Sequence, residues 1–503
     1  MYEDNKIYMG LAEGQKVYMH LSQANRHGLI AGASGTGKTV TMKVMAEAFS
    51  DAGVPVFLCD VKGDVSGLAV PGDDSEGMQK RIDKFGIRDV FRYRGYPVCF
   101  WDIYARGGHP VRTTVSDMGP EILARIMGLT EIQEGVLNII FRIADDCGLK
   151  ILDMKDLRAV INYVTEHRRE YALQYGNIAA QSIGAITRAL IPLEDQGAGE
   201  FFGEPALDFS DWLRRDDAGR GIINVLHSVE VIKYPKLYAM FLLWMMAELF
   251  ENLPEVGDGE KPKIVFFFDE AHLLFSQSSR ALQEKIVQIV KLIRSKGVGV
   301  FFVTQSPADI PNEVLAQLSN RIQHSLRAYT PAEIKATKQA ADSFRDNPDL
   351  NEAELITNMK TGSALVSVLD ADGAPTVVQH TKILPPKSSM EIAPESLREQ
   401  AWKADLLYGK YEKDIDPDSA YEDLESVRQA EAAAAEAEKQ RIADEKQAAK
   451  DAAAAERAAQ KEAEREAREK ERLKKKFMSR AENEIMNFGI RSAKKFLKGL
   501  LSK

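Results

Sequence analysis

The chain has 503 residues, a length that exceeds one compact core and fits about two or three domains. Apolar residues make up 45% and charged residues 28%, so the composition excludes a chain that is mostly disordered. Its 66 Lys and Arg residues against 75 Asp and Glu residues give a net charge of −9, which excludes a protein that is basic throughout. Nucleic-acid binding is not excluded, because it depends on where the positive charge lies.

Cysteine usage and hydropathy predict a cytoplasmic protein. Cys59, Cys99 and Cys147 are far apart in the sequence, which fits reduced thiols and indicates neither a zinc site nor a disulfide framework. The most apolar run, 237–250, contains Glu248 and is shorter than the roughly 20 residues that a membrane-spanning helix needs. The N-terminal sequence lacks the basic and apolar regions of a secretion signal.

The first predicted elements form a βαβ unit. Residues 27–32 (HGLIAG) are expected to form a buried strand, and residues 39–53 a helix that ends at a glycine. Residues 54–60 (VPVFLCD) are almost wholly apolar, which predicts a second strand covered on both faces. Strand, helix and strand within about 35 residues predict a right-handed crossover and an α/β fold.

Residues 110–220 contain amphipathic helical patterns and few strand-like runs, which predicts an α-helical insertion. Further strands are expected at 221–227, 263–272, 297–305 and 321–329, a hairpin at 362–383, and helices at 235–252 and 280–295. The predicted division is 1–109 for N-terminal strands and the first half of a core domain, 110–220 for the insertion, 221–390 for the second half of the core, 391–427 for a linker, and 428–503 for a charged, Ala-rich helix with a basic amphipathic tail.

The last part of the chain differs in composition from the rest. The segment 431–470 is rich in Ala, Glu, Lys and Arg and has no aromatic residue, Gly or Pro, which favours a solvated single helix. Regular Leu or Ile heptad positions are missing there, which disfavours a tight coiled coil. Residues 471–503 carry 10 basic and 3 acidic residues together with large apolar ones such as Phe477, Phe488 and Leu501.

This basic tail has several possible roles. Residues 1–420 carry a net charge of −12, so the tail can dock on that acidic body or mediate self-assembly, which is the preferred interpretation. A basic amphipathic helix can also bind a membrane surface or a protein partner, or contact nucleic acid.

The strongest motif lies between the first predicted strand and its helix. It is a complete G-x-x-x-x-G-K-[ST] phosphate-binding loop, and we expect the nucleotide to contact Gly32, Ala33, Ser34, Gly35, Thr36, Gly37, Lys38, Thr39 and Val40. Its glycines let backbone N–H groups converge on phosphate oxygens at the start of a helix. Lys38 is expected to neutralise the phosphates of ATP, and the Thr39 hydroxyl to bind Mg²⁺. The alternative, a glycine-rich turn without nucleotide, is disfavoured by this strand–turn–helix context.

A second motif is the apolar run that ends in two carboxylates. Asp269 is expected to hold Mg²⁺ through water, as a Walker B aspartate does, and Glu270 to act as the general base. Such a run is weak evidence alone, because the ends of many surface strands look similar. Together with the phosphate-binding loop it favours hydrolysis over kinase-type transfer.

Other polar residues follow predicted strands. Gln305 can sense the terminal phosphate or the attacking water, or bond to backbone at the strand's end. The segment 60–64 (DVKGD) lies where doubly wound sheets bind ligands, with an ordinary turn as an equally good interpretation. We expect His272 to support the two carboxylates rather than to ligate a metal. Arg294 and Arg321 are the candidate arginine fingers, although most arginines only solubilise a surface.

With these motifs in order, the chain resembles the HerA/FtsK superfamily of P-loop ATPases, and within it the bacterial HerA-like helicase (YjgR-like) branch. The resemblance rests on NRHGLIAGASGTGKTVT (25–41), DVKGDVSGLA (60–69), FFFDEAHLLF (266–275), IRSKGVGVFFVTQSP (293–307) and LSNRIQHSLRA (318–328). It implies a RecA-like core of the additional-strand, catalytic-glutamate type. Members are commonly hexameric rings that hydrolyse ATP with Mg²⁺ and translocate DNA.

The resemblance also implies residue roles. It makes Gln305 the sensor and Arg294 a finger that acts on a neighbouring subunit's site, and hence predicts a homo-oligomer. The first predicted strand begins at His27, and the segment before it is shorter than the N-terminal barrel by which archaeal HerA engages a nuclease. A nuclease partner is therefore not expected.

The leading hypothesis is an oligomeric, Mg²⁺-dependent ATPase that couples hydrolysis to DNA translocation or unwinding. The alternative from another class is a nucleotide-dependent scaffold or switch that recruits a partner or a membrane through its C-terminal tail. A P-loop kinase is disfavoured, because Glu270 follows Asp269 directly.

Overall fold

The computed structural model describes residues 1–257, 259–276 and 280–500. They belong to two units, Met1–Leu424 and Glu425–Lys503. The described part of the first unit is organised by one mixed sheet of 13 strands, in the order β1-β2-β13-β12-β11-β4-β10-β9-β5-β8-β6-β7, with β3 paired to β2. Its central strands run parallel, as the predicted βαβ unit requires.

The parallel strands are β4 (Gly28–Ala31), β5 (Val56–Asp60), β6 (Val98–Asp102), β7 (His109–Pro110), β8 (Ile223–His227), β9 (Ile264–Phe268), β10 (Val298–Thr304) and β11 (Asn320–Gln323). Every residue of β5, β9 and β10 is buried, which explains why these strands are apolar along nearly their whole length. β10 lies between β4 and β9, so the strand before the glycine-rich loop is not adjacent to the strand that ends at the carboxylates.

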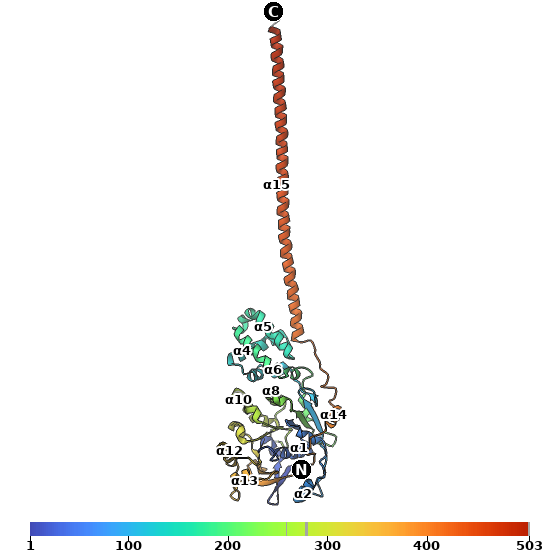
Figure 1. Ribbon diagram of the computed structural model, residues 1–503, viewed down its shortest axis with the longest axis vertical. Helices are drawn as coiled ribbons and strands as arrows, with labels where there is room; N and C mark the ends of the chain where they lie inside the picture. Colours follow the sequence, from blue (N-terminus) through green and yellow to red (C-terminus); the bar gives the residue numbers. More distant parts are fainter. Residues whose placement is uncertain (258, 277–279, 501–503) are drawn as a thin grey trace. The chain divides into compact units, whose positions relative to one another are not determined.

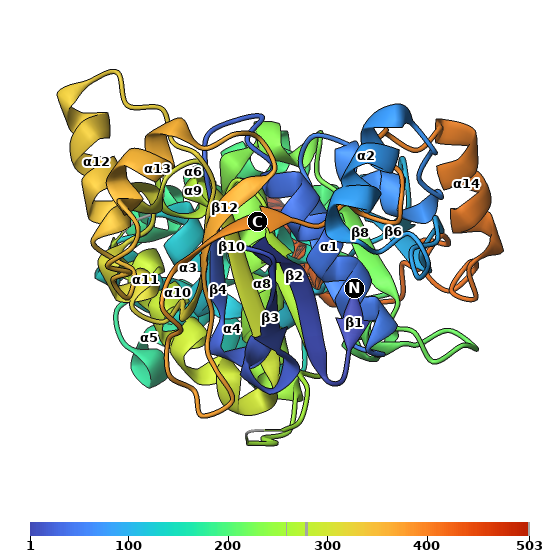
Figure 2. The same ribbon diagram turned by 90° about the horizontal axis from the view of Figure 1, so that it is seen from below.

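Helices cover both faces of this sheet, as Figure 2 shows. On one face Phe49 of α1 (Lys38–Asp51) packs against Phe267 and Phe301, with ring centroids 6.3 Å away in both cases. On the other face Phe57 contacts Phe241 of α8 (Pro235–Asn252), at 6.3 Å. Alternate residues of the central strands therefore contribute to two separate cores.

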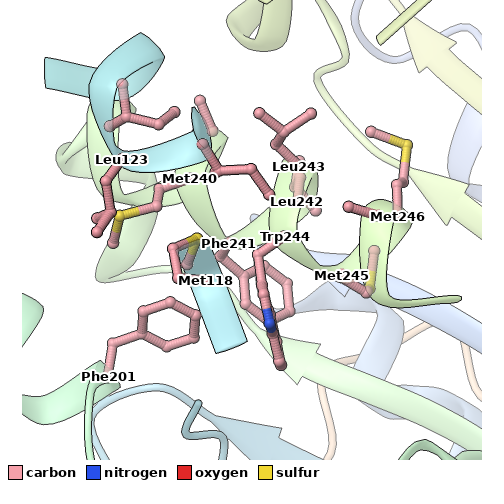
Figure 3. Close-up of a cluster of buried hydrophobic side chains, with 14 of the residues drawn as sticks. Met118, Leu123, Phe201, Met240, Phe241, Leu242, Leu243, Trp244, Met245 and Met246 are labelled. Carbon is pink, nitrogen blue, oxygen red and sulfur yellow. The ribbon is translucent and has the colours of Figure 1, made fainter. Parts of the chain in front are cut away.

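Five helices lie between β7 and β8 in the chain and contribute to the core that contains Phe57 and α8. They are α3 (Val115–Met127), α4 (Glu131–Cys147), α5 (Met154–Tyr175), α6 (Ala180–Asp195) and α7 (Ala198–Phe201). Met118 and Leu123 of α3 lie in one cluster with Phe201 and the Met240–Met246 stretch of α8 (Figure 3). α8 is apolar nearly all round because neighbours cover most of its surface.

The sheet extends beyond β11 through antiparallel strands. They are β1 (Tyr2–Glu3), β2 (Lys6–Ala12), β3 (Gln15–His20), β12 (Ser363–Ser367) and β13 (Gln379–Ile383). The expected hairpin is β12 and β13, and β13 pairs with β2. The expectation that the first strand begins at His27 is therefore wrong, because β1, β2 and β3 precede β4. In the pairing of β2 with β3 the register shifts between Tyr8 and Gly10. This shift interrupts the alternation of apolar and polar residues in β2, so the strand is hard to recognise in the sequence.

The remaining helices are α2 (Glu76–Phe85), α9 (His272–Ser276), α10 (Arg280–Ile293), α11 (Asn312–Leu315), α12 (Pro331–Ala341), α13 (Glu352–Asn358), α14 (Glu395–Ala404) and α15 (Ala420–Leu500). The 3-10 turns are η1 (Leu21–Arg26), η2 (Asp64–Ala69), η3 (Phe209–Leu213), η4 (Val231–Lys233), η5 (Arg294–Lys296) and η6 (Pro307–Asp309).

α15 is one continuous helix (Figure 1), and its described side chains from 426 to 495 are all exposed. Ion pairs three or four residues apart, such as Arg441 with Glu438 and Glu445, run along it. Leu501, at the end of the predicted tail, lies outside the described residues. Within the described chain, no helix is both long and apolar enough to cross a membrane.

Candidate functional site

The glycine-rich loop connects the carboxyl end of β4 to the start of α1. Gly32 and Gly37 have φ of 157° and 118°, in the region that favours glycine. A Cβ on Gly32 would lie 2.5 Å from the Cβ of His324, so no larger residue fits there. The Gly32 N–H donates to Thr304 O at 3.2 Å, and the Ala33 N–H to Ser325 O at 2.8 Å. The chain at the carboxyl ends of β10 and β11 thus fixes the loop.

Lys38 is the first residue of α1 and is buried. Its Nζ donates to Gly32 O at 2.6 Å and to Ala33 O at 3.2 Å, so the side chain folds back under the loop. Burial, and then the charge of Lys62, lower the pKa of Lys38. A bound anion would favour the charged form of this lysine.

The two predicted carboxylates lie directly after β9. Asp269 and Glu270 are only 3% and 7% exposed. The Glu270 N–H donates to Asp269 Oδ1 at 2.9 Å. Burial and the neighbouring Glu270 charge raise the pKa of Asp269 to about 6. Two adjacent buried carboxylates repel each other, and a cation beside them relieves that repulsion.

Glu270 has three polar partners around its carboxylate. Lys62 Nζ lies 2.9 Å from Oε1, and Gln305 Nε2 donates to Oε2 at 3.3 Å. His272 Nδ1 lies 3.4 Å from Oε2 but makes no hydrogen bond to the described residues. Burial raises the pKa of Glu270, but these partners, Lys62 above all, outweigh burial and leave the pKa below its ordinary value. Glu270 has φ of 49°, so its backbone conformation is one that non-glycine residues rarely adopt.

The segment after β5 is an ordered loop rather than a simple turn. Asp60 is 1% exposed, and its carboxylate accepts hydrogen bonds from the N–H groups of Gly63, Val65 and Ser66 at 2.7, 3.3 and 3.1 Å. These bonds position Lys62 over Glu270. The sequence contained this lysine in the DVKGD segment, but did not show that β5 and β9 are neighbours.

His324 was also missed by the sequence motifs. Its Nδ1–H donates to Ser363 O at 3.0 Å, and its Nε2 accepts from the Thr41 hydroxyl at 2.9 Å. The histidine therefore ties α1 to β12, directly beneath the loop. The segment LSNRIQHSLRA (318–328), which contains His324, gave a strand signal and part of the family resemblance, but no role for the histidine.

A cavity of about 350 Å³ opens beside the loop. Ala33, Ser34, His272, Gln305 and Arg327 are among its lining residues. The described residues provide no hydrogen bond or ion pair to the Arg327 side chain. Arg327 is thus a cationic residue of the site that sequence spacing did not single out.

The two predicted arginine fingers lie away from this edge of the sheet. Arg294 precedes β10, whereas Gln305 follows it, so the two residues lie at opposite ends of one strand. Arg321 donates to Leu315 O, Leu318 O and Ser343 O at 3.1, 3.2 and 3.0 Å. These bonds to backbone carbonyls favour a structural role for Arg321.

The residues present fit a nucleotide and a divalent cation. Backbone N–H groups at the start of α1 and the buried Lys38 suit phosphate oxygens. The Thr39 hydroxyl, in the first turn of α1, and the Asp269 carboxylate would hold Mg²⁺, a cation that prefers oxygen ligands.

A second polar cluster lies at the far edge of the sheet. Cys99, His109 and Asp405 place ligand-type atoms within 4.8 Å of one another. Arg214 Nη2 lies 3.5 Å from Cys99 Sγ and 3.1 Å from Asp405 Oδ1, so a cationic group already belongs to the cluster. Glu412 Oε1 accepts from His109 Nδ1. We therefore interpret the cluster as a buried charge network.

Comparison with known proteins identifies the family. The sequence pattern of the helicase HerA-like C-terminal family matches residues 6–503. The chain belongs to this family. The match confirms the resemblance to HerA within the HerA/FtsK superfamily.

HerA-like relatives include two archaeal proteins named DNA double-strand break repair helicase HerA. The protein from Sulfolobus acidocaldarius is 21% identical over 400 residues, which cover 75% of this chain and 69% of the relative. The protein from Sulfurisphaera tokodaii is 24% identical over 177 residues, which cover 33% of this chain and 35% of the relative.

Solved structures share the fold of the HerA-like chain. The bacterial conjugative coupling protein TrwB, in an unbound form, gives a TM-score of 0.51 at 14% identity and covers 78% of this chain and 93% of its own. TrwB in complex with ADP and Mg²⁺ gives a TM-score of 0.50 at 14% identity, covering 78% and 99%. The α/β fold with a mixed sheet therefore resembles that of TrwB.

Proposed function

We propose that this HerA-like chain is a Mg²⁺-dependent ATP hydrolase that works on DNA as an oligomeric ring. The observation that carries the proposal is the Glu270 carboxylate, held by Lys62 and Gln305 beside Asp269 and the buried Lys38. The position of β10 between β4 and β9 further supports a RecA-like core of the additional-strand, catalytic-glutamate type.

Each residue of this edge has a chemical task in hydrolysis. Lys38 neutralises charge on the phosphates, and Glu270 accepts a proton from the attacking water. Gln305 orients the water or the terminal phosphate from the end of β10. Mg²⁺ supplies neutralisation of the charge that develops on the phosphate oxygens. TrwB, with the same fold, binds ADP and Mg²⁺, which supports both cofactors.

Ring assembly is supported by the position of Arg294. A seven-residue strand spans about 23 Å, so this side chain at the amino end of β10 is remote from its own site. An arginine finger at this position therefore acts on a neighbouring subunit. The DNA part of the proposal is supported by the two relatives, which are named DNA double-strand break repair helicases.

ATP turnover with and without double- and single-stranded DNA tests the proposal. We expect Lys38→Ala and Glu270→Gln to reduce kcat by about 10² to 10⁴, because each removes a group needed in the transition state. Light scattering in the same buffer measures the assembly. Unchanged turnover in both variants would refute the ATPase, whereas a ring without DNA-stimulated turnover would remove only the DNA part.

A nucleotide-dependent scaffold remains the second candidate, because α15 exposes large apolar residues. Phe477, Ile485 and Phe488 are 76%, 72% and 75% exposed, amid lysines and arginines. Such a helix face suits a partner or an anionic membrane surface. Deletion of residues 428–503 separates the candidates: a motor keeps its DNA response, whereas a scaffold loses its partner or its localisation.

A further inference from the structure

Lys62, a lysine to which the motifs assign no role, contacts the general base of the proposed reaction. It follows β5, the strand beside β9, and its Nζ lies 2.9 Å from Glu270 Oε1. The side chain of Lys62 is 46% exposed, whereas that of Glu270 is 9% exposed. A half-exposed ammonium group on a flexible stem can leave its partner at little cost. Lys62 is therefore suited to exchange one anionic partner for another.

The backbone that carries Lys62 is held in place. Asp60 Oδ1 accepts the Gly63 N–H at 2.7 Å, and Asp60 Oδ2 accepts the Ser66 N–H at 3.1 Å. Gly63 has φ of 83°, a conformation that favours glycine. The loop therefore keeps the backbone of Lys62 beside Glu270. Any exchange of partner is a movement of the Lys62 side chain alone.

Lys62 also lies at the same edge of the sheet as the phosphate-binding lysine. Lys38 begins α1 after β4, and Lys62 follows β5, so both side chains lie where these parallel strands end. Two cations at one edge of the sheet repel each other, and a multiply charged anion between them removes that repulsion. The terminal phosphate of a nucleotide bound at Lys38 is such an anion, and lysine is a common phosphate ligand.

We propose that Lys62 senses the terminal phosphate of ATP: it alternates between Glu270 and that phosphate, and its departure releases Glu270 for catalysis. The inference rests on the ATPase function proposed above and adds a residue that contacts the substrate. In the released state one Glu270 oxygen loses its ammonium partner, while Gln305 keeps the other oxygen oriented.

The water oxygen bonds to the terminal phosphorus, the bond from that phosphorus to the bridging oxygen of ADP breaks, and the water proton passes to Glu270. Lys62 pairs with charge on the transferred phosphoryl group during this step. After phosphate leaves, Lys62 returns to Glu270, so that the carboxylate is available only when a terminal phosphate is present.

Nucleotide affinity tests the proposal without relying on turnover. In the full chain with Mg²⁺, calorimetry compares a non-hydrolysable ATP analogue with ADP. We expect Lys62→Ala to weaken analogue binding by about 10- to 100-fold, the range for a lost charge-assisted hydrogen bond, and ADP binding by less than about threefold. Lys62→Arg keeps the positive charge and should restore most of the preference for the analogue.

A matched control is Lys80→Ala on α2, because Lys80 is also an exposed lysine paired with a glutamate, Glu76. It should change neither affinity. No weakening by Lys62→Ala, or equal weakening of the analogue and ADP, would overturn the inference. A different result, an unaltered chain that neither binds the analogue nor hydrolyses ATP, would refute the proposed function instead.

Discussion

Two buried histidines, His27 and His324, act as neutral connectors between elements. His27 donates from Nε2 to Val290 O at 2.8 Å and accepts the Val300 N–H at Nδ1, at 3.1 Å. His324 bridges Thr41 and Ser363 in the same way. Burial lowers the pKa of each to about 4, and the nearby positive charge of Arg294 or Lys38 acts in the same direction. Each histidine uses both nitrogens in this way only while it is neutral.

These pKa values predict a loss of stability in acid. The unfolded chain binds a proton at each histidine near pH 6.5, whereas the folded chain resists protonation down to about pH 4. Each histidine therefore stabilises the fold fully above pH 6.5, and this contribution falls as the pH drops towards 4, by up to about 3 kcal/mol. Urea unfolding between pH 7 and 4.5 measures it.

Comparison with His324→Gln isolates one histidine from the carboxylates that titrate in the same range. Glutamine does not titrate, so the variant should start less stable at pH 7 and lose less stability on acidification than the unaltered chain. Parallel pH curves for the two proteins would contradict the role assigned to His324.

At the scale of elements, the segment after α14 is fixed to the sheet edge by Asp405. Its carboxylate accepts the Leu407 N–H at 2.8 Å and pairs with Arg214 at 3.1 Å. His109 Nε2 lies 3.6 Å away. Burial raises the pKa of Asp405, but these three partners outweigh burial and hold the pKa well below its ordinary range. The ionised carboxylate thus links α14 to β7 and to the loop before β8.

We expect Asp405→Asn to lower the free energy of unfolding by about 2 kcal/mol, because it removes the charge from hydrogen bonds in a half-buried network. Asp414→Asn is the control, since Asp414 also pairs with an arginine, Arg112, but is 82% exposed. The control should change stability by less than about 0.5 kcal/mol. Equal effects in urea titrations would show that Asp405 is an ordinary surface pair.

The Asp405 linkage also has a defined pH range. Because the folded-state pKa lies below the unfolded value, the linkage stabilises the fold fully above about pH 4 and is lost as the pH falls through the folded-state pKa. The difference in stability between the unaltered chain and Asp405→Asn should therefore shrink in acid.

The elements around the phosphate-binding loop were predictable because their signals are local. The strand expected at 27–32 is β4, and the helix expected at 235–252 has those bounds as α8. Both elements are apolar runs that lie between residues that interrupt strands and helices. β11 ends at Gln323 rather than at 329, because the chain after it turns away to bond with other segments.

The site was only half predictable, for a physical reason. Lys38, Asp269 and Glu270 stand at fixed places in motifs, so sequence spacing suffices to find them. Lys62, His324 and Arg327 belong to the site only because strands that are distant in the sequence are neighbours in the sheet. A pattern within one segment carries no information about such neighbours.

At the scale of the whole molecule, the buried residues are concentrated in Met1–Leu424. The described side chains from 426 to 495 are all exposed. A part that buries little surface contributes little to the cooperative unfolding of the rest. The C-terminal unit is thus a solvated helix with its own composition, as its Ala, Glu, Lys and Arg content predicted.

Removal of residues 428–503 should therefore leave the unfolding of the first unit unchanged. Calorimetry should show the same Tm for both chains within about 2 °C, while circular dichroism loses helical signal. The cut lies after Leu424, so the buried start of α15 is retained. A Tm lower by more than about 4 °C would show that the helix stabilises the first unit.

The pairing of β4 has a consequence for how the chain is made. The sheet partners of Gly28–Ala31 are 301–304 and 320–323, so more than half of the chain is synthesised between this strand and its neighbours. At about 5 to 20 residues per second, a ribosome takes roughly 15 to 60 s to deliver them. Throughout that interval the phosphate-binding loop lacks its neighbouring strands, and β5 has no partner until β8 has been made. We expect the nascent chain to need protection by chaperones, and nucleotide binding to begin only after synthesis has passed β11.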